Sequence, residues 1–434
     1  MAFEHYIRSG GRNLRLGYTT GTCAALACAG AAEGLLTGRI PQVLNLITPK
    51  GIEVSARPVS CAVEYGSGCL YQTSTGEMRP PAVPCLARCG VVKDAGDDID
   101  ATNGLLIMAQ AQYWNPESVL SGGTPREESI RILGGKGVGR VTRPGLDQKV
   151  GEAAINSVPR QMIRQEVLRV CSEQGYEGGM TITVSVPDGE AAAEKTLNAS
   201  LGIVGGISII GTSGIVEPMS MKAYSDSVRL RIRQARSEGK QDLILTPGNY
   251  GLSFLRQAGY DLMDVPVVVC SNFIGDALDE AAADGFGRIL LAGHVGKLVK
   301  IAAGIMNTHS SMADGRCEIF TAHAALAGAS AETCARLMDA VTSDGCIAIL
   351  REAGIDRAVL GTILEKAQGY LDRRNAGTRC GMILFSNVYG ELGRTGIAKE
   401  ILEAWTAGSE LICTAVWQDS QKSQENGKEF RSRV

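Results

Sequence analysis

The stretch from Leu201 to Leu245 limits the fold of this chain more than any other part of the sequence. It begins LGIVGGISIIGTSGIVEPMS, and residues 203–210 are too uniformly apolar for a strand with one solvent-exposed face. We therefore expect a buried strand at 203–210, a turn at 211–214, a helix that ends at Gly239 and a second buried strand at 242–246. This order predicts a right-handed βαβ unit. The apolar face of the helix is expected to contain Met221, Tyr224, Val228, Ile232 and Ala235.

Polar and glycine residues follow three expected strands, at 203–210, 242–246 and 265–270. Open α/β sheets bind their ligands at the carboxyl ends of the strands, so these residues are candidates for one cofactor-binding edge. Neither G-x-G-x-x-G nor a P-loop occurs, and a purely structural turn is the alternative at 211–214. The candidates are Gly211, Thr212, Ser213, Gly214, Glu217, Thr246, Gly248, Asn249, Ser271 and Asn272.

The composition excludes several classes of protein. With 44% hydrophobic and 21% charged residues, the chain has the profile of a globular protein, and 434 residues are too many for one ordinary core. A net charge of −3 argues against nucleic acid as the main partner. The longest apolar run is broken by glycines and is too short for a membrane span. Thirteen cysteines without a secretory signal favour reduced thiols in the cytoplasm, and their spacing predicts no metal site.

Changes in pattern along the chain predict two domains and a tail. Residues 1–198 combine a helix of very small side chains, which starts near Thr22, with alternating strands such as 180–186, and we expect an α+β domain. Residues 199–409 alternate strands, glycine-bearing loops and helices, which predicts an α/β domain with a mainly parallel, Rossmann-like sheet. Residues 410–434 are polar, and we expect a disordered tail.

Two polar stretches of the first domain are candidates for binding. Thr19 and Thr20 precede the small-residue helix and could offer amides and hydroxyls to an anionic group, although simple capping is the alternative. Further on, Asp94 and Asp97 belong to a cluster of four aspartates within residues 94–100. Such a cluster needs amides, a cation or a hydroxyl-bearing ligand, or else forms a solvated turn with Asx caps.

A glycine-rich loop at 134–139 surrounds Lys136, and Arg140 and Arg143 follow closely, which makes three cations. No serine or threonine follows the lysine, so the loop suits several carboxylates better than one triphosphate. The alternative is a hairpin with solvated basic residues. Two of the four histidines, His294 and His309, lie in loops at the expected ligand edge and are candidates for proton transfer, although a lone histidine is more often structural.

Six motifs in order resemble the cobalt-precorrin-5B C-1 methyltransferase family of anaerobic cobalamin biosynthesis, the CbiD type. They are TTGTCAA, VKDAGDD-x-D-x-TNG, GGKGVGRVTRPGL, AIN-x-VPRQMI, TLN-x-x-LGIVGGISIIGTSGIVEPMS and GH-x-GKLVK-x-A-x-G-x-MNTHS-x-x-ADGR. The resemblance covers about residues 10–410. The sequence departs from the family pattern at Ile99 and Ser157, where prolines are expected, and at Ser213, where a second threonine is usual.

The resemblance implies that S-adenosylmethionine methylates a ring carbon of cobalt-precorrin-5B to give cobalt-precorrin-6A. Cobalt then arrives inside the tetrapyrrole substrate, and the protein itself binds no metal. The family also has an α+β first domain and a second domain with a parallel sheet. The edge residues would hold the methyl donor, and Asp94, Asp97, His294 and His309 are the candidates for a proton-transfer role. The expected substrate contacts are Thr19, Thr20, Lys93, Lys136, Arg140 and Arg143.

Two other readings remain open on the sequence. One is an NAD(P)-linked oxidoreductase, which the absent G-x-G-x-x-G motif disfavours. The other is a non-catalytic tetrapyrrole carrier, which would need the basic loop but no second, glycine-lined site. The sequence also leaves a homo-oligomer open.

Overall fold

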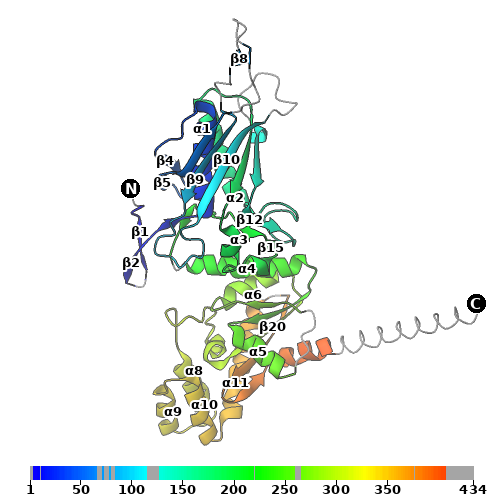
Figure 1. Ribbon diagram of the computed structural model, residues 1–434. Helices are drawn as coiled ribbons and strands as arrows, with labels where there is room; N and C mark the ends of the chain where they lie inside the picture. The colour runs from blue at the N-terminus through cyan, green and yellow to red at the C-terminus, as the bar shows by residue number, and fades with distance from the viewer. Residues whose placement is uncertain are drawn as a thin grey trace, which may run out of the picture. The chain divides into compact units, whose positions relative to one another are not determined.

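The computed structural model describes residues 3–9, 11–65, 71–72, 78–79, 84–114, 127–218, 220–259, 265–375 and 377–406. The chain forms two compact units, Met1–Ser220 and Met221–Val434, each with its own hydrophobic core (Figure 1). The boundary expected after residue 198 therefore lies inside unit 1, because residues 203–216 pair with strands of that unit. The expected tail at 410–434 lies outside the described residues.

Unit 1 contains a mixed five-stranded sheet in the order β11-β14-β10-β9-β6. Only β11 and β14 pair in parallel, and the other neighbours are antiparallel. The antiparallel partner expected for the alternating strand at 180–186 is thus present as β10. The strands are β6 (Val59–Glu64), β9 (Leu86–Val92), β10 (Leu106–Trp114), β11 (Ile130–Gly134) and β14 (Gly179–Ser185).

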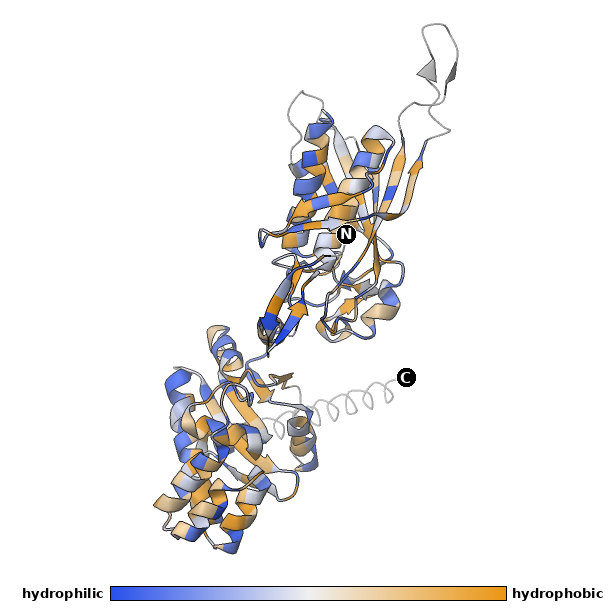
Figure 2. Cartoon of the chain, turned by 90° about the vertical axis from the view of Figure 1, so that its left-hand side faces the viewer, coloured by the Kyte–Doolittle hydropathy of each residue, from blue (hydrophilic) through white to orange (hydrophobic). Residues whose placement is uncertain are grey.

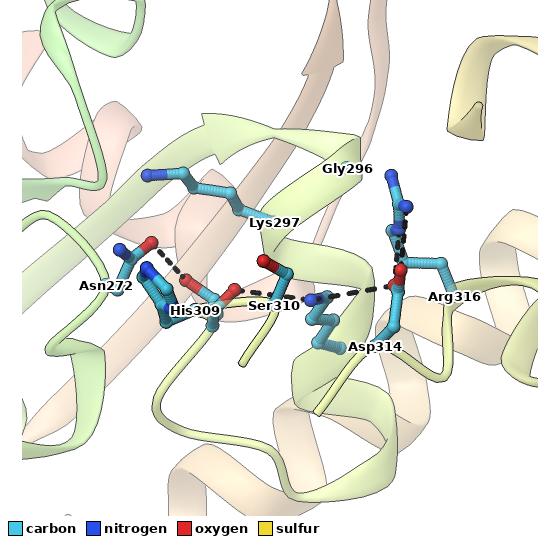
Figure 3. A pocket seen from close by; sticks show the side chains of 9 residues that line it. Asn272, Gly296, Lys297, His309, Ser310, Asp314 and Arg316 are labelled. Carbon is cyan, nitrogen blue, oxygen red and sulfur yellow. Dashed lines mark hydrogen bonds and ion pairs between the residues drawn. The ribbon is translucent and has the colours of Figure 1, made fainter. Parts of the chain in front are cut away.

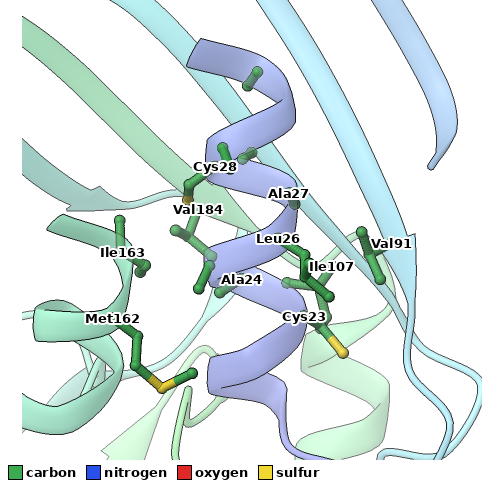
Figure 4. Close-up of a cluster of buried hydrophobic side chains, with 14 of the residues drawn as sticks. Cys23, Ala24, Leu26, Ala27, Cys28, Val91, Ile107, Met162, Ile163 and Val184 are labelled. Carbon is green, nitrogen blue, oxygen red and sulfur yellow. The ribbon is translucent and has the colours of Figure 1, made fainter. Parts of the chain in front are cut away.

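Two helices cover this sheet, α1 (Thr20–Thr37) and α2 (Ser157–Glu173). Figure 4 shows α1 with Met162 and Ile163 of α2 on one side and the sheet residues Val91 and Ile107 on the other. The alanine, cysteine and glycine side chains of α1 are almost all buried, which confirms the expected small-residue helix. A Cβ added at Gly30 would lie 2.7 Å from the Cys89 sulfur, so the helix approaches the sheet more closely than larger side chains would allow.

Short ribbons complete unit 1, and each pairs two strands. The antiparallel pairs are β1 (Tyr6–Ser9) with β2 (Arg12–Arg15), β3 (Gly17–Tyr18) with β17 (Ile215–Val216), β4 (Leu44–Ile47) with β5 (Glu53–Ala56), β7 (Tyr71–Gln72) with β8 (Met78–Arg79), and β13 (Arg140–Val141) with β15 (Ile203–Val204). The parallel pair is β12 (Gly137–Val138) with β16 (Gly206–Ile207). The short helix α3 spans Gly189–Ala193.

The buried strand expected at 203–210 is wrong, and with it the first strand of the expected βαβ unit. Gly205 has a φ of +78° and breaks the run into β15 and β16, which pair with different partners. A Cβ at Gly206 would lie 2.2 Å from the Gly137 carbonyl oxygen, so this glycine allows two backbones to touch. Because the run is broken, Val204 and Ile210 remain about half exposed, at 51% and 49%.

Unit 2 contains a mainly parallel sheet in the order β19-β18-β20-β21-β22, in which only the edge strand β22 is antiparallel. Its strands are β18 (Asp242–Thr246), β19 (Val267–Val269), β20 (Arg288–His294), β21 (Arg379–Ser386) and β22 (Gly390–Arg394). Its helices are α4 (Met221–Ser237), α5 (Asn249–Gln257), α6 (Ile274–Ala283), α7 (Val295–Leu298), η3 (Val299–Ala303), α8 (Arg316–Leu326), α9 (Ala331–Met338), α10 (Ser343–Glu352) and α11 (Asp356–Arg374).

The expected helix before β18 is confirmed as α4, but its buried face is narrower than the sequence suggested. Val228, Ile232 and Ala235 are buried, whereas Met221 and Tyr224 are 42% and 65% exposed. The strands of both main sheets are largely hydrophobic, and many helices carry hydrophilic residues beside hydrophobic ones (Figure 2). This contrast is typical of helices that cover a sheet with one face only.

Candidate functional site

The strand order of unit 2 places a topological switch point between β18 and β20. The chain runs from β18 to the edge strand β19 and then returns to the other side of β18 as β20. The connections that leave β18 and β20 therefore diverge, and such a switch point is where open α/β sheets bind ligands. Residues 246–248 follow β18, residues 270–272 follow β19, and residues 294–297 follow β20.

The side chain of Lys297 links the connection after β20 to the connection after β18. Its ammonium group donates a hydrogen bond of 3.1 Å to the carbonyl oxygen of Pro247, which follows β18. The side chain is partly buried, and this burial lowers the pKa of Lys297. The neighbouring Cys270 is fully buried, and burial raises the pKa of its thiol to about 12. Cys270 is therefore a protonated, structural thiol at neutral pH.

Hydrogen bonds join the segment that follows η3 to the connection after β19. The Thr308 amide donates to the Asn272 carbonyl oxygen at 3.0 Å, and the Thr308 hydroxyl donates to the Asn272 side-chain oxygen at 3.2 Å. Lys300 is only 3% exposed, and its ammonium donates to the carbonyl oxygens of Thr308 (3.2 Å) and Ala313 (2.8 Å). These acceptors compensate for the desolvation of a buried cation and hold the segment 308–313 in place.

Asp314 neutralises two of the neighbouring cations. Arg316 holds its carboxylate with two hydrogen bonds, and Lys300 lies 3.6 Å away. These contacts, chiefly that with Arg316, lower the pKa of Asp314 to about 2. Asp314 is thus ionised at neutral pH and is a poor proton acceptor.

Together these residues line a pocket of about 320 Å³ on unit 2 (Figure 3). That volume lies at the lower end of the usual range for small-molecule sites. The lining includes the backbone at Gly296 and the polar residues Thr308 and Ser310. Its other side chains are Asn272, Lys297, Lys300, His309, Asp314 and Arg316.

The two candidate histidines differ in what they can offer to a ligand. His294 is the N-cap of α7, where its Nδ1 accepts the Gly296 amide at 3.1 Å, and its Nε2 lies 3.8 Å from Asp344. Both ring nitrogens of His294 therefore face groups of its own unit. In His309, Nδ1 accepts the Ser311 amide at 3.1 Å and lies 2.6 Å from the Ser311 hydroxyl. The amide fixes Nδ1 as an acceptor, so the hydroxyl also donates to it and the neutral ring carries its proton on Nε2, and His309 lines the pocket.

The remaining candidates of unit 2 lie at the same edge of the sheet. Thr246 is fully buried, and its hydroxyl has no hydrogen-bond partner among the residues that the structure describes. Gly248 is the N-cap of α5, and Asn249 is its first residue. Ser271 has a φ of +54°, an uncommon conformation for a non-glycine residue, which marks a tightly shaped connection between β19 and α6.

The other expected cofactor residues belong to unit 1 and do not follow strands of the unit 2 sheet. Gly211, Thr212, Ser213, Gly214 and Glu217 all belong to unit 1. A Cβ at Gly211 would lie 2.3 Å from the Thr19 hydroxyl oxygen, and the Ser213 carbonyl oxygen accepts the Lys50 amide at 3.1 Å. Glu217 forms an ion pair with Lys50. The loop at 211–217 is thus packed against the start of α1 and the β4–β5 hairpin.

Thr19 and Thr20 support this packing. The Thr19 hydroxyl caps α1 by accepting the Thr22 amide at 3.2 Å, and the Thr20 hydroxyl accepts the Ile210 amide at 2.9 Å. The Gly21 amide donates to the Ile210 carbonyl oxygen at 3.0 Å. These amides and hydroxyls, which the sequence offered for an anionic group, already bond to other groups of the chain.

The acidic loop of unit 1 is likewise satisfied internally. Asp94 accepts two hydrogen bonds from the Arg15 guanidinium at 2.6 and 2.8 Å, and Arg15 lowers the pKa of Asp94. Asp97 accepts the Arg15 amide at 2.7 Å. Lys93 is only 2% exposed and forms an ion pair with Asp100. These contacts agree with the alternative given above for the aspartate cluster, a turn whose carboxylates are hydrogen-bonded within the chain.

Lys136, Arg140 and Arg143 are exposed on unit 1. Arg140 faces Val204 in the register of β13 and β15, and its guanidinium also donates to the Gly151 carbonyl oxygen. The side chain of Arg143 lies against Gly202, where an added Cβ would be 2.5 Å from its Cγ. Arg140 of the basic loop is therefore exposed on the same two-stranded ribbon as the apolar residue Val204.

The sequence reasoning missed the cations of the pocket. Lys297 and Lys300 stand in the motif GH-x-GKLVK, and Asp314 and Arg316 stand in ADGR. The available signal was their position after an expected strand of a parallel sheet, where polar side chains converge. Within the described residues, no group of three or more His, Cys, Asp and Glu side chains could hold a metal ion. No described helix is long and apolar enough to span a membrane.

Unit 2 is an α/β unit with a polar pocket at the carboxyl edge of its parallel sheet. Sequence comparisons identify the family of the chain. Residues 7–218 match the CbiD family model, and residues 307–396 match the model of the CbiD C-terminal domain. A cobalt-precorrin-5B C(1)-methyltransferase of Ruminiclostridium cellulolyticum is 44% identical over 90% of this chain and 93% of that protein. The protein of the same name from Alkaliphilus metalliredigens is 38% identical over 92% and 97%. This chain belongs to the CbiD family.

A cobalamin biosynthesis protein (cbiD) from Archaeoglobus fulgidus is similar to this chain among solved structures. It is 28% identical, and the match covers 72% of this chain and 87% of that one with a TM-score of 0.34.

Proposed function

We propose that this chain is a cobalt-precorrin-5B C(1)-methyltransferase that uses S-adenosylmethionine as methyl donor. One observation carries the proposal: the 44% identity to a protein of that name extends over 90% of the chain. The match includes both compact units, so it covers the sheet edge of unit 2 and the basic loop of unit 1 alike.

The methyl donor is proposed to bind at the carboxyl edge of the unit 2 sheet. The pocket beside the switch point supports this, together with the buried, unpartnered hydroxyl of Thr246. These features fit a ligand with hydroxyl, amine and carboxylate groups. The proposed donor-site residues are Thr246, Gly248, Asn249, Ser271 and Asn272. Residues 211–214 and Glu217 stay predictions, although their loop already makes contacts within unit 1.

The carboxylates of the macrocycle are proposed to bind Lys136, Arg140 and Arg143 on unit 1. Their exposure supports this, since an exposed cation can reach a large ligand without first breaking a buried contact. Thr19, Thr20 and Lys93 are weaker candidates, because their polar groups already have partners within the unit.

Methyl transfer from a sulfonium is an in-line displacement. The bond from sulfur to the methyl carbon breaks, a bond from that carbon to ring carbon 1 forms, and S-adenosylhomocysteine leaves. The donor supplies the electrophilic methyl group, and the residues of the chain hold and orient both reactants. Where a proton must be moved, we favour His309, because Asp94 and Asp97 are held by Arg15 and both nitrogens of His294 face protein groups.

The test is incubation of the purified protein with S-adenosylmethionine and cobalt-precorrin-5B, followed by mass analysis of the macrocycle. A gain of one methyl group with formation of S-adenosylhomocysteine is the expected result. Macrocycle binding without methylation would instead favour the carrier alternative, and reduction of NAD(P) would favour the oxidoreductase. A cytoplasmic location and a homo-oligomeric state stay predictions.

A further inference from the structure

The charges of the unit 2 pocket do not balance. Lys297, Lys300 and Arg316 contribute three positive charges and Asp314 one negative charge, which leaves a net charge of +2 among these four lining residues. Asp314 is shared by Arg316 and Lys300. Lys297 has no carboxylate within ion-pair distance among the described residues, and its one hydrogen bond there goes to the Pro247 carbonyl oxygen.

An ammonium group has three N–H donors, so Lys297 keeps two of them for another acceptor. Partial burial makes an unpaired cation costly, and the neighbouring Lys300 adds repulsion. A bound anion would remove both costs. Lys297 is therefore the cation of the pocket whose charge no carboxylate among the described residues balances.

Two neutral donors accompany Lys297 in the lining. The proton of neutral His309 is directed to Nε2, because Ser311 donates its amide to Nδ1. The side-chain oxygen of Asn272 is occupied by the Thr308 hydroxyl, so its NH₂ group remains available as a donor. One ammonium and two further N–H donors match the oxygens of a carboxylate.

We propose that this pocket binds a carboxylate of a reactant, with Lys297 as its ionic partner and His309 and Asn272 as hydrogen-bond donors. The inference rests on the proposed function, because both reactants of that reaction carry carboxylates. One source is the amino-acid part of the methyl donor, and the other is the acetate and propionate groups of the macrocycle.

The experiment measures calorimetric binding of three probes to the full chain. The probes are S-adenosylhomocysteine, 5′-methylthioadenosine, which lacks the amino-acid part, and uroporphyrin III, a tetrapyrrole with eight carboxylates. The variants are Lys297→Met, which removes the charge, Lys297→Arg, which keeps it, and Lys399→Met as a control. Lys399 is an exposed lysine of unit 2 whose side chain is 69% exposed.

If the carboxylate belongs to the donor, Lys297→Met weakens S-adenosylhomocysteine about 10- to 100-fold and leaves methylthioadenosine unchanged. If it belongs to the macrocycle, uroporphyrin III alone is weakened. In either case Lys297→Arg recovers part of the loss, and Lys399→Met behaves as the wild type does. Thermal unfolding of each variant shows whether the fold is kept.

The proposal is overturned if Lys297→Met binds all three probes like the wild type, or loses methylthioadenosine as much as S-adenosylhomocysteine. Full methyl transfer together with either result leaves the proposed function intact and removes only the carboxylate site. Conversely, Lys297-dependent binding in a wild type that transfers no methyl group keeps the site and refutes the function. A wild type that binds no probe overturns the carboxylate site, and the methyl-transfer assay then decides separately whether the function fails too.

Discussion

Unit 1 and unit 2 each contain a glycine-bearing loop that the sequence predicts at a ligand edge, yet the two loops use their polar groups differently. In unit 1, the start of α1 is hydrogen-bonded to the segment 210–214: the Thr20 hydroxyl accepts the Ile210 amide, and the amides of Gly21 and Thr19 donate to the carbonyl oxygens of Ile210 and Gly214. In unit 2, Lys297, His309 and Asn272 line a pocket with donors to spare. Glycine-rich turns therefore show where backbones pass closely, whereas unfilled hydrogen-bonding capacity distinguishes the proposed ligand site.

The largest effect is expected from a pair of glycine substitutions, one in each loop. Gly211→Ala should lower the free energy of unfolding of unit 1 by about 3–4 kcal/mol, because Gly211 has a φ of +133° and an added Cβ would lie 2.3 Å from Thr19. Gly248→Ala should cost less than about 1 kcal/mol, because Gly248 is extended and open. Calorimetric unfolding measures both, and equal losses would remove the contrast between the loops.

The next effect concerns the two histidines of unit 2. His309→Ala should lower kcat/KM for methyl transfer about 10- to 100-fold with little change in stability, because it removes a donor to a charged ligand. His294→Ala should lower stability by about 1 kcal/mol, because it removes the N-cap of α7, and should change kcat/KM by less than about threefold. The reverse pattern would move the catalytic role to His294.

A substitution in the acidic loop of unit 1 should lower the free energy of unfolding and leave the rate of methyl transfer unchanged. Asp94→Asn should cost about 1 kcal/mol at pH 7, a figure reduced for the partial solvent exposure of the Arg15 pair. Because the folded pKa of Asp94 lies below its usual 3.8, its stabilising contribution is complete above that value and is lost as the pH falls through the folded pKa. Urea unfolding from pH 7 to pH 3 should therefore show a shallower acid decline in the variant. A loss of turnover out of proportion to stability would instead make Asp94 catalytic.

The smallest effect is expected at the exposed basic loop. Arg140→Ala should weaken uroporphyrin III binding about two- to fivefold and leave S-adenosylhomocysteine binding unchanged, because an exposed cation contributes up to about 1 kcal/mol. Arg57→Ala, an exposed arginine elsewhere on unit 1, is the matched control. Equal losses of both ligands in Arg140→Ala would contradict the assignment of macrocycle and donor to different units.

The sequence predicted the elements whose periodicity is long and regular. Helices α1 and α4 and the strands β14 and β18 lie where the pattern placed them. The strand at 203–210 was wrong, because an apolar run does not show that Gly205 turns the chain away and that Gly206 must touch Gly137. The same limit applies to the site. Lys297 stands in a recognised motif, but only the contacts of Asp314 show which cation lacks a partner.

Hydrogen exchange with and without S-adenosylhomocysteine tests the central contrast most directly. Slower amide exchange is expected at the edge of unit 2, in residues 246–249, 270–272, 294–300 and 307–316, with no change in residues 208–217. Protection at 208–217 with an unchanged edge in unit 2 would contradict the account and return the methyl donor to the glycine-rich loop of unit 1.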